Sequence, residues 1–259
     1  MELQIKEKLA QIEEQKNVKI IYAIESGSRA WGFASPNSDY DVRFIYVRDT
    51  EFYLKLNKQR SVIEWQLDDI FDINGWDVKK ACELLYKSNP TILEWCNSPI
   101  IYKETPEFQR FRQVALEYFR PKVVAYHYLS IAKKDYCSNL QNENIKLKSY
   151  FYILRALLSC RWTLEIQSAP PIEFRILAEK YLDGEKLNIV KNLIEVKACA
   201  NEANHVEKIS LLDNYICMEI HQMENKLLSF EKSQKNSWDD INKLFLSYTS
   251  FENKEECLC

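Results

Sequence analysis

The spacing of apolar residues changes near residue 103, and this change constrains the fold more than any other feature. Before it, short apolar runs rich in β-branched residues alternate with segments of helical spacing. After it, the segments follow a period of about 3.6 residues, which is typical of helices. We therefore expect an α+β protein, with a domain of strands and helices in residues 1–103 and an all-helical domain in residues 104–259.

The first domain is expected to contain one helix and four strands before its next helices begin. The helix is predicted at residues 2–16, and the strands at 18–24, 40–47, 61–67 and 70–76. The last two strands are expected to pair through Asp68-Asp69. Asp77 and Asn89 are suitable N-caps for the helices that follow them.

Composition narrows the class of protein. A formal net charge of −3 argues against a nonspecific nucleic-acid coat protein, which needs a cationic surface. No long apolar run and no signal-peptide pattern is present, so we expect a cytoplasmic protein without a membrane partner. The eight cysteines form no CxxC pair and are interpreted as reduced thiols rather than zinc ligands.

The chemistry is concentrated between residues 25 and 47. Gly27-Ser28 directly follows the first predicted strand, where backbone N–H groups and a hydroxyl can approach phosphate oxygens closely. Asp39 and Asp41 follow about ten residues later, and residues two apart in a strand share a face. Two carboxylates held so close favour a divalent cation between them, and oxygen ligands favour Mg²⁺ or Mn²⁺.

Three further residues complete this candidate site. Asp72 lies between Phe71 and Ile73, where an acid has little structural reason to occur, and it is the candidate for a third metal-binding carboxylate. Arg29 and Arg43 are nearby cations that can contact nucleotide phosphates. A simpler interpretation remains open, in which residues 35–39 form an ordinary turn and Asp41 is solvated.

These motifs resemble the signature of the DNA polymerase β-like nucleotidyltransferase superfamily, which is Gly-Ser followed by Asp-x-Asp and a later strand acid. More narrowly, residues 27–32 and 38–44 resemble the YcgL/RlaP family of predicted nucleotidyltransferases. Further segments share the resemblance: residues 74–77, 87–90, 94–95, 98–102, 150–155 and 170–174. Residues 51–70 and 181–259 give no firm motif match.

The resemblance implies a mixed-sheet catalytic domain followed by an all-helical domain, and it also implies roles for individual residues. It implies phosphate binding by Gly27 and Ser28, and metal binding and catalysis by Asp39, Asp41 and Asp72. The expected reaction is Mg²⁺-dependent transfer of a nucleoside monophosphate from an NTP to an acceptor hydroxyl. Because the family is associated with RNA repair, an RNA or tRNA end is one acceptor that it implies. A small molecule or a protein hydroxyl remains an alternative acceptor, and a regulatory module that binds nucleotides without turnover is an alternative function.

One stripe in the helical part is a further candidate for nucleotide binding. Lys148, Tyr152 and Arg155 share a face of a predicted helix at spacings of four and three residues. Either this stripe faces the cleft and binds the triphosphate or the acceptor backbone, or it is a solvated surface.

Overall fold

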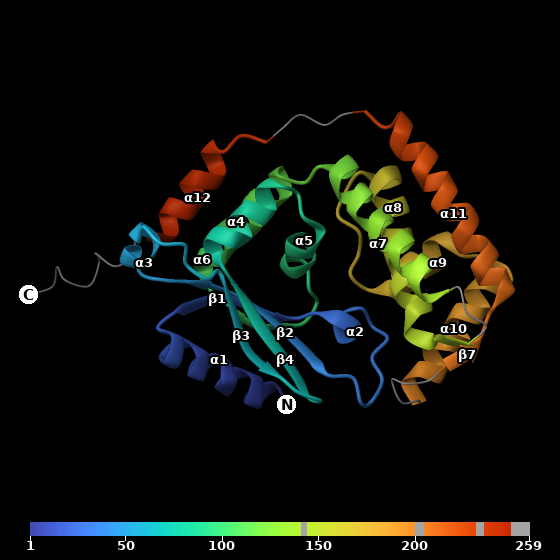
Figure 1. The fold of residues 1–259 in the computed structure, drawn as a ribbon, viewed down its shortest axis with the longest axis horizontal. Coiled ribbons are helices and arrows are strands. Elements are labelled where there is room, and N and C mark those ends of the chain that lie inside the picture. The colour runs from blue at the N-terminus through green and yellow to red at the C-terminus, as the bar shows by residue number, and fades with distance from the viewer. Residues whose placement is uncertain (141–143, 200–204, 232–235, 250–259) are drawn as a thin grey trace, which may run out of the picture.

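The computed structural model describes residues 1–140, 144–199, 205–231 and 236–249. A five-stranded sheet lies at its centre, with the strand order β3-β4-β2-β1-β5 (Figure 1). Its strands are β1 (Lys19–Glu25), β2 (Tyr40–Val47), β3 (Val62–Leu67), β4 (Phe71–Asp77) and β5 (Ile101–Glu104). β2 and β4 are parallel, and the other neighbours are antiparallel, so the sheet is mixed as expected.

Local sequence explains how two of these strands are joined. The side chain of Asp68 accepts hydrogen bonds from the backbone N–H groups of Ile70 and Phe71 at 2.8 and 2.7 Å. This arrangement closes the turn between β3 and β4, because an aspartate side chain satisfies turn amides that have no strand partner. The predicted pairing through Asp68-Asp69 is confirmed.

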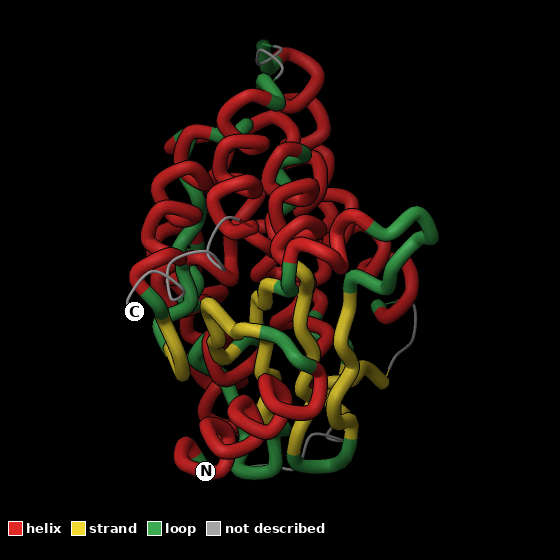
Figure 2. Tube along the Cα trace, turned by 90° about the vertical axis from the view of Figure 1, so that its left-hand side faces the viewer, coloured by secondary structure: helices red, strands yellow, loops and turns green. Residues whose placement is uncertain are grey.

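Helices cover both faces of the sheet. Helix α1 (Glu2–Lys16) packs Ile5, Leu9 and Ile12 against one face, together with Phe44 and Tyr46 of β2. Four helices contribute to the core on the other face: α4 (Val78–Tyr86), α5 (Pro90–Cys96), α6 (Pro106–Glu117) and α12 (Asp239–Thr249). In Figure 2 the strands lie together in the lower half, with helices above and below them.

The remaining helices form the second half of the molecule, beside the sheet in Figure 1. They are α7 (Pro121–Asn139), α8 (Leu147–Ile166), α9 (Phe174–Tyr181), α10 (Gly184–Cys199) and α11 (Ser210–Ser229). Two three-residue strands that periodicity did not predict, β6 (Asn144–Lys146) and β7 (His205–Glu207), pair beside them. This part is otherwise helical, as the sequence predicts.

The hydrophobic core does not stop at the predicted boundary near residue 103. One cluster of buried side chains extends from Ile21 in β1 to Tyr248 in α12. The Tyr248 hydroxyl also donates to the backbone oxygen of Glu107 in α6 at 3.0 Å. The sheet ends at Glu104, close to that boundary, but a later helix returns to pack beside it. The division into domains 1–103 and 104–259 therefore stays a prediction.

Sequence signals account for the starts of α4 and α5. Asp77 accepts from the N–H of Lys79 at 2.8 Å, and Asn89 accepts from the N–H of Thr91 at 2.9 Å. Both predicted N-caps are confirmed. The short elements β5, α2 (Gly27–Ala30) and α3 (Thr50–Leu54) have too few residues for a recognisable period, and periodicity missed them. Within the described residues, no helix has the length and apolar character needed to cross a membrane.

Candidate active site

Two aspartates from neighbouring strands lie side by side at the start of the parallel pair. Asp41 in β2 and Asp72 in β4 are register partners, so their side chains project from the same face. Their side chains remain 20% and 25% exposed, unlike the apolar residues around them. The parallel register therefore brings together two acids that are 31 residues apart in the sequence.

A guanidinium group lies between these two carboxylates. Arg43 Nη2 donates to Asp41 Oδ1 at 2.8 Å and to Asp72 Oδ2 at 2.6 Å. Its Nη1 donates to the backbone oxygen of Asp72 at 2.6 Å. Both carboxylates thus present oxygens to one point, and a cationic nitrogen occupies it. This is the geometry expected for a shared cation, and Arg43 contacts the acids directly.

Asp39 differs from these two acids. β2 begins at Tyr40, so Asp39 lies just before the strand and not within it. Among the described residues, no three Asp, Glu, His or Cys side chains gather closely enough to hold a metal ion. The structure therefore brings Asp41 and Asp72 together but does not add Asp39 to them. The donor set itself suits a hard cation, since both paired acids offer only oxygen.

Gly27 lies against Asp41 of the acid pair, and only a residue without a side chain fits there. Its φ of +61° lies in the left-handed region, and an added Cβ would lie 1.8 Å from Asp41 Oδ2. The next residues form the single helical turn α2, with Ser28 buried. The N–H of Ser26 also donates to the backbone oxygen of Asp41 at 2.8 Å. Glycine is needed here because the backbone and a carboxylate approach each other so closely.

Arg29 supports the loop that leads into β2. Its Nε donates to the backbone oxygen of Asp39 at 3.0 Å, and its Nη2 donates to that of Ser38 at 2.5 Å. The guanidinium also stacks on Tyr40, with 3.8 Å between its central carbon and the ring centroid. These contacts give Arg29 a structural task, and its predicted contact with nucleotide phosphate remains a prediction.

Glu25 is a residue of this site that sequence reasoning missed. It is fully buried at the end of β1, and its Oε1 accepts from the N–H of Asp41 at 2.9 Å. The hydroxyl of Tyr102 donates to its Oε2 at 2.5 Å. Burial raises the pKa of Glu25 to about 7, against the lowering effect of these hydrogen bonds. The signal available in the sequence was an acid at the end of an apolar strand, directly before Ser26-Gly27-Ser28.

The predicted stripe on α8 reaches this loop through Trp31. Arg155 is only 5% exposed, and its guanidinium carbon lies 4.2 Å from the centroid of Trp31. Its Nη2 also lies 3.0 Å from Glu94 Oε1 in α5. Tyr152 meets the edge of Trp31 at 5.2 Å between ring centroids. Arg155 is therefore not part of a solvated surface.

The third member of the stripe is different. Lys148 is partly exposed, one turn before Tyr152. The three residues thus share a helix face but lie at different depths. Nucleotide binding by Lys148, Tyr152 and Arg155 stays a prediction. The burial of Arg155 beside the loop of residues 27–32 is the structural observation that bears on it.

Comparison with known proteins decides the family. Residues 1–247 match the model described as "RlaP: RNA repair pathway DNA polymerase beta family". The chain belongs to this family. It is also 36% identical over 249 residues to the uncharacterized protein YcgL of Bacillus subtilis, covering 95% of this chain and 96% of that protein. Family membership confirms the resemblance stated from the motifs, and with it a nucleotidyltransferase-like character.

A solved structure was also found, with a more distant likeness. It is a nucleotidyltransferase-like protein from Exiguobacterium sibiricum, with 10% identity and a TM-score of 0.33. The match covers 94% of this chain and 79% of that one.

Proposed function

We propose that this protein is a Mg²⁺-dependent nucleotidyltransferase that transfers a nucleoside monophosphate from an NTP to a hydroxyl at an RNA end. The observation that carries the proposal is the in-register pair Asp41 and Asp72, with Gly27 of the preceding turn packed against Asp41. Membership of a family described by RNA repair and DNA polymerase β supports the substrate class.

The reaction requires an acceptor oxygen to attack the α-phosphorus of the NTP in line. A bond forms between this oxygen and phosphorus, the bond to the β-phosphate oxygen breaks, and pyrophosphate leaves. The acceptor hydroxyl would pass its proton to the Asp72 carboxylate as the new bond forms. The residues of the chain would orient the two reactants and balance the negative charge that develops on the phosphate oxygens.

The metal would be held by Asp41 and Asp72, with Asp39 as the predicted third ligand. When bound, Mg²⁺ neutralises charge on the phosphate and lowers the pKa of the acceptor hydroxyl. The fit is supported by the convergence of Asp41 Oδ1 and Asp72 Oδ2 on one cationic nitrogen. Arg43 occupies that point in the structure, so its guanidinium would turn outward when the metal binds, toward the phosphates it is predicted to contact.

The Gly27-Ser28 turn would receive the triphosphate. Gly27 begins α2 directly beside Asp41, and the first N–H groups of a helix have no partner within the helix itself. Trp31, four residues later, links this turn to Arg155 and Tyr152 of α8. A triphosphate placed at the turn would therefore lie between the acid pair and the helical half, as the predicted role of α8 requires.

The test is to find which molecule becomes labelled. The protein is incubated with α-labelled NTPs, Mg²⁺ and RNA that carries either a free 3′-hydroxyl or a 3′-phosphate. We expect label to enter only the RNA with the free hydroxyl, and chelation of Mg²⁺ to prevent it. Label in a protein or a small molecule would replace RNA as the acceptor. No label with any acceptor would contradict nucleotidyl transfer itself.

A further inference from the structure

A basic groove lies at the other end of the parallel strands from the acid pair. Its cavity volume is about 350 Å³. We name it the α3–α4 groove, after the helices on its two sides. Its charged lining residues are Lys55, Lys58, Arg60, Asp77, Lys79, Lys80 and Glu83. Five cations and two acids line the groove, which is a local excess of positive charge in a chain whose net charge is −3.

Four of these cations form no ion pair with the described residues. Arg60 donates to Glu64 at 2.7 Å, which neutralises it locally. Within the part of the chain that the structure describes, none of Lys55, Lys58, Lys79 and Lys80 lies within ion-pair distance of a carboxylate. Four ammonium groups around one groove repel each other, and an anionic ligand would relieve that repulsion.

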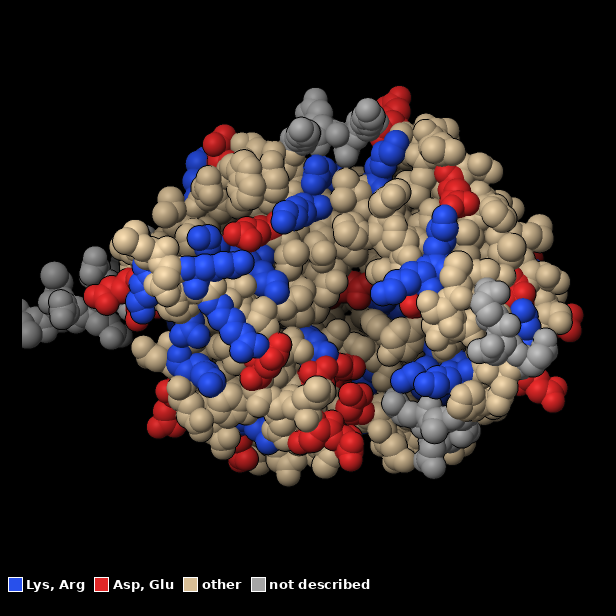
Figure 3. All heavy atoms as spheres, in the orientation of Figure 1, with Lys and Arg blue, Asp and Glu red and all other residues tan. Residues whose placement is uncertain are grey.

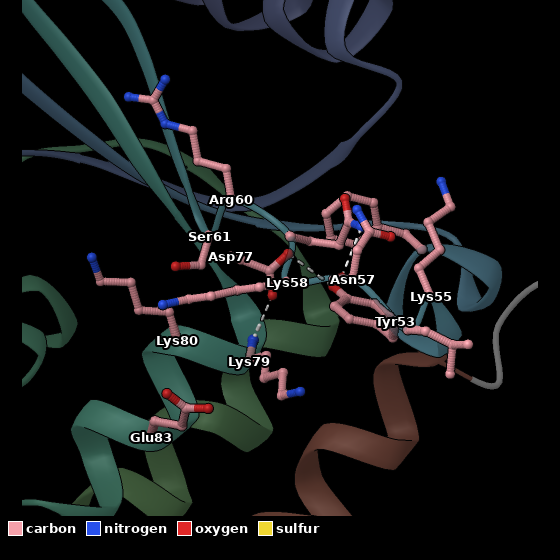
Figure 4. A pocket seen from close by; sticks show the side chains of 13 residues that line it. Tyr53, Lys55, Asn57, Lys58, Arg60, Ser61, Asp77, Lys79, Lys80 and Glu83 are labelled. Carbon is pink, nitrogen blue, oxygen red and sulfur yellow. Dashed lines mark hydrogen bonds between the residues drawn. The ribbon is translucent and has the colours of Figure 1, made fainter.

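The acid on the groove floor does not cancel this charge. Asp77 is 2% exposed, and its oxygens accept from the N–H of Lys79 and from the hydroxyl of Tyr53. These two hydrogen bonds, drawn as dashed lines in Figure 4, hold its carboxylate in place. Figure 3 shows the result on the surface, where Lys and Arg side chains gather over α3 and α4.

The lysines are spread along the groove and do not converge on one point. In Figure 4, Lys58 and Lys80 extend toward one side, while Lys55 and Lys79 point in other directions. They come from three segments: α3 and its end, the loop before β3, and the first turn of α4. Such a distribution suits a chain of separated phosphates better than one compact triphosphate, which needs convergent donors.

The spacing from the acid pair fits an extended ligand. Asp72 and Asp77 are the second and last residues of β4, and five residues of strand span about 17 Å. Along a duplex, one strand advances about 3.4 Å per nucleotide, so this span corresponds to about five nucleotides. An RNA whose end lies at the acid pair would therefore reach the groove with its backbone.

We propose that the α3–α4 groove binds the phosphate backbone of the acceptor RNA about five nucleotides from the reacting end. The proposal rests on the proposed function for the position of that end. The groove itself contributes no reacting group. It adds affinity and register, because phosphate contacts position a nucleic acid without reading its sequence.

RNA binding across a salt series tests the groove directly. The variants are Lys58→Ala/Lys80→Ala in the groove and Lys134→Ala/Lys191→Ala on exposed positions of α7 and α10, which remove the same charge. We expect the groove variant to bind a 20-nucleotide RNA roughly tenfold more weakly at low salt, with a salt slope lower by roughly 1.5. Equal slopes and affinities in the two variants would overturn the proposal, and thermal unfolding checks that both are folded.

RNA length separates this proposal from the proposed function. Transfer to a trinucleotide should be equal in the wild type and the groove variant, because so short an RNA does not reach the groove. Transfer to the 20-nucleotide RNA at subsaturating concentration should fall roughly tenfold in the groove variant only. Equal losses with both RNAs, or weaker NTP binding by calorimetry, would assign the lysines to the nucleotide instead. If the wild type transfers to no RNA, the proposed function fails, and the salt series still decides whether the groove binds RNA.

Discussion

Strand β4 carries an aspartate near each end, and the two have opposite surroundings. Asp72 is a quarter exposed, lies beside a second acid and contacts a guanidinium. Asp77 is buried, caps α4 and accepts from a phenol hydroxyl. Being five residues apart, they project to opposite faces of a regular strand. Residue type alone therefore does not separate a candidate site residue from a structural one, because the partners and the exposure of the side chain differ between the two.

Burial has a measurable consequence for Asp77. It raises the pKa of this carboxyl to about 6, although the bonds from Lys79 N–H and Tyr53 lower it. The group therefore resists ionisation at a pH where an ordinary aspartate is charged. A carboxylate that is costly to ionise suits a structural position, whereas metal binding needs the charged form.

The largest expected effect is on transfer by the acid pair. Asp41→Asn and Asp72→Asn should each reduce transfer by roughly 1,000-fold, because each removes a charged ligand of the proposed metal. The free energy of unfolding should change by about 1 kcal/mol or less, since both side chains are partly exposed. Initial rates with labelled NTP and urea unfolding measure the two quantities. Full activity in either variant would show that the pair is not the metal site.

The next effect concerns stability as a function of pH and belongs to Asp77. A carboxyl with a raised folded-state pKa contributes stability below its unfolded pKa of about 3.8 and loses it as pH rises through about 6. Asp77→Asn keeps a good N-cap but cannot ionise. Its stability relative to wild type should therefore improve by up to about 3 kcal/mol between pH 4 and pH 7.

Urea unfolding of both proteins at several pH values checks this prediction. The quantity to compare is the difference in the free energy of unfolding between the two proteins, since other groups titrate equally in both. The corresponding variant Asp72→Asn serves as the comparison from the other end of the strand. A pH-independent difference for Asp77→Asn would show that burial does not perturb this carboxyl.

A smaller effect is expected from filling the space beside Asp41. Gly27→Ala places a methyl group 1.8 Å from Asp41 Oδ2 and forces alanine into a left-handed conformation. The backbone strain costs about 1–2 kcal/mol of stability, and displacement of the carboxylate should reduce transfer by roughly 100-fold. Gly184→Ala is a matched control, because Gly184 also has a positive φ of +46° but nothing within 4 Å of an added Cβ. Equal activity losses in the two variants would mean that the close approach is irrelevant to catalysis.

Much of the sheet could be predicted from the sequence because its signals are local. Apolar runs gave β1 to β4 within a residue or so, and Asp77 and Asn89 were correctly identified as caps. The Asp-x-Asp motif predicts Asp41 as a site residue, and the apolar neighbours Phe71 and Ile73 predict Asp72. The parallel register brings these two acids together.

Contacts between distant segments account for what could not be predicted. Arg155 is buried by Glu94 and Trp31, which no helical spacing reveals. The α3–α4 groove joins lysines from three segments that have no motif. Glu25 and Tyr102 are 77 residues apart, and only the antiparallel pairing of β1 with β5 places them together. Asp39 illustrates the remaining difficulty, because a one-residue difference in where β2 begins decides whether it shares the face of Asp41.

The smallest predicted effect isolates the partner of Asp77. Tyr53→Phe removes the hydroxyl that donates to Asp77 Oδ2 at 3.2 Å and accepts from the N–H of Arg48 at 3.1 Å. Its loss should cost about 1 kcal/mol of stability and leave transfer unchanged, because the proposed site of reaction lies at the other end of the strand. Since the lost bond favours the ionised carboxylate, the deficit should be larger at pH 8 than at pH 5. Tyr126→Phe removes an exposed hydroxyl and should change stability at neither pH. A loss of transfer in Tyr53→Phe comparable to that in Asp72→Asn would contradict the separation of the two ends, and would assign the buried aspartate to the reaction as well.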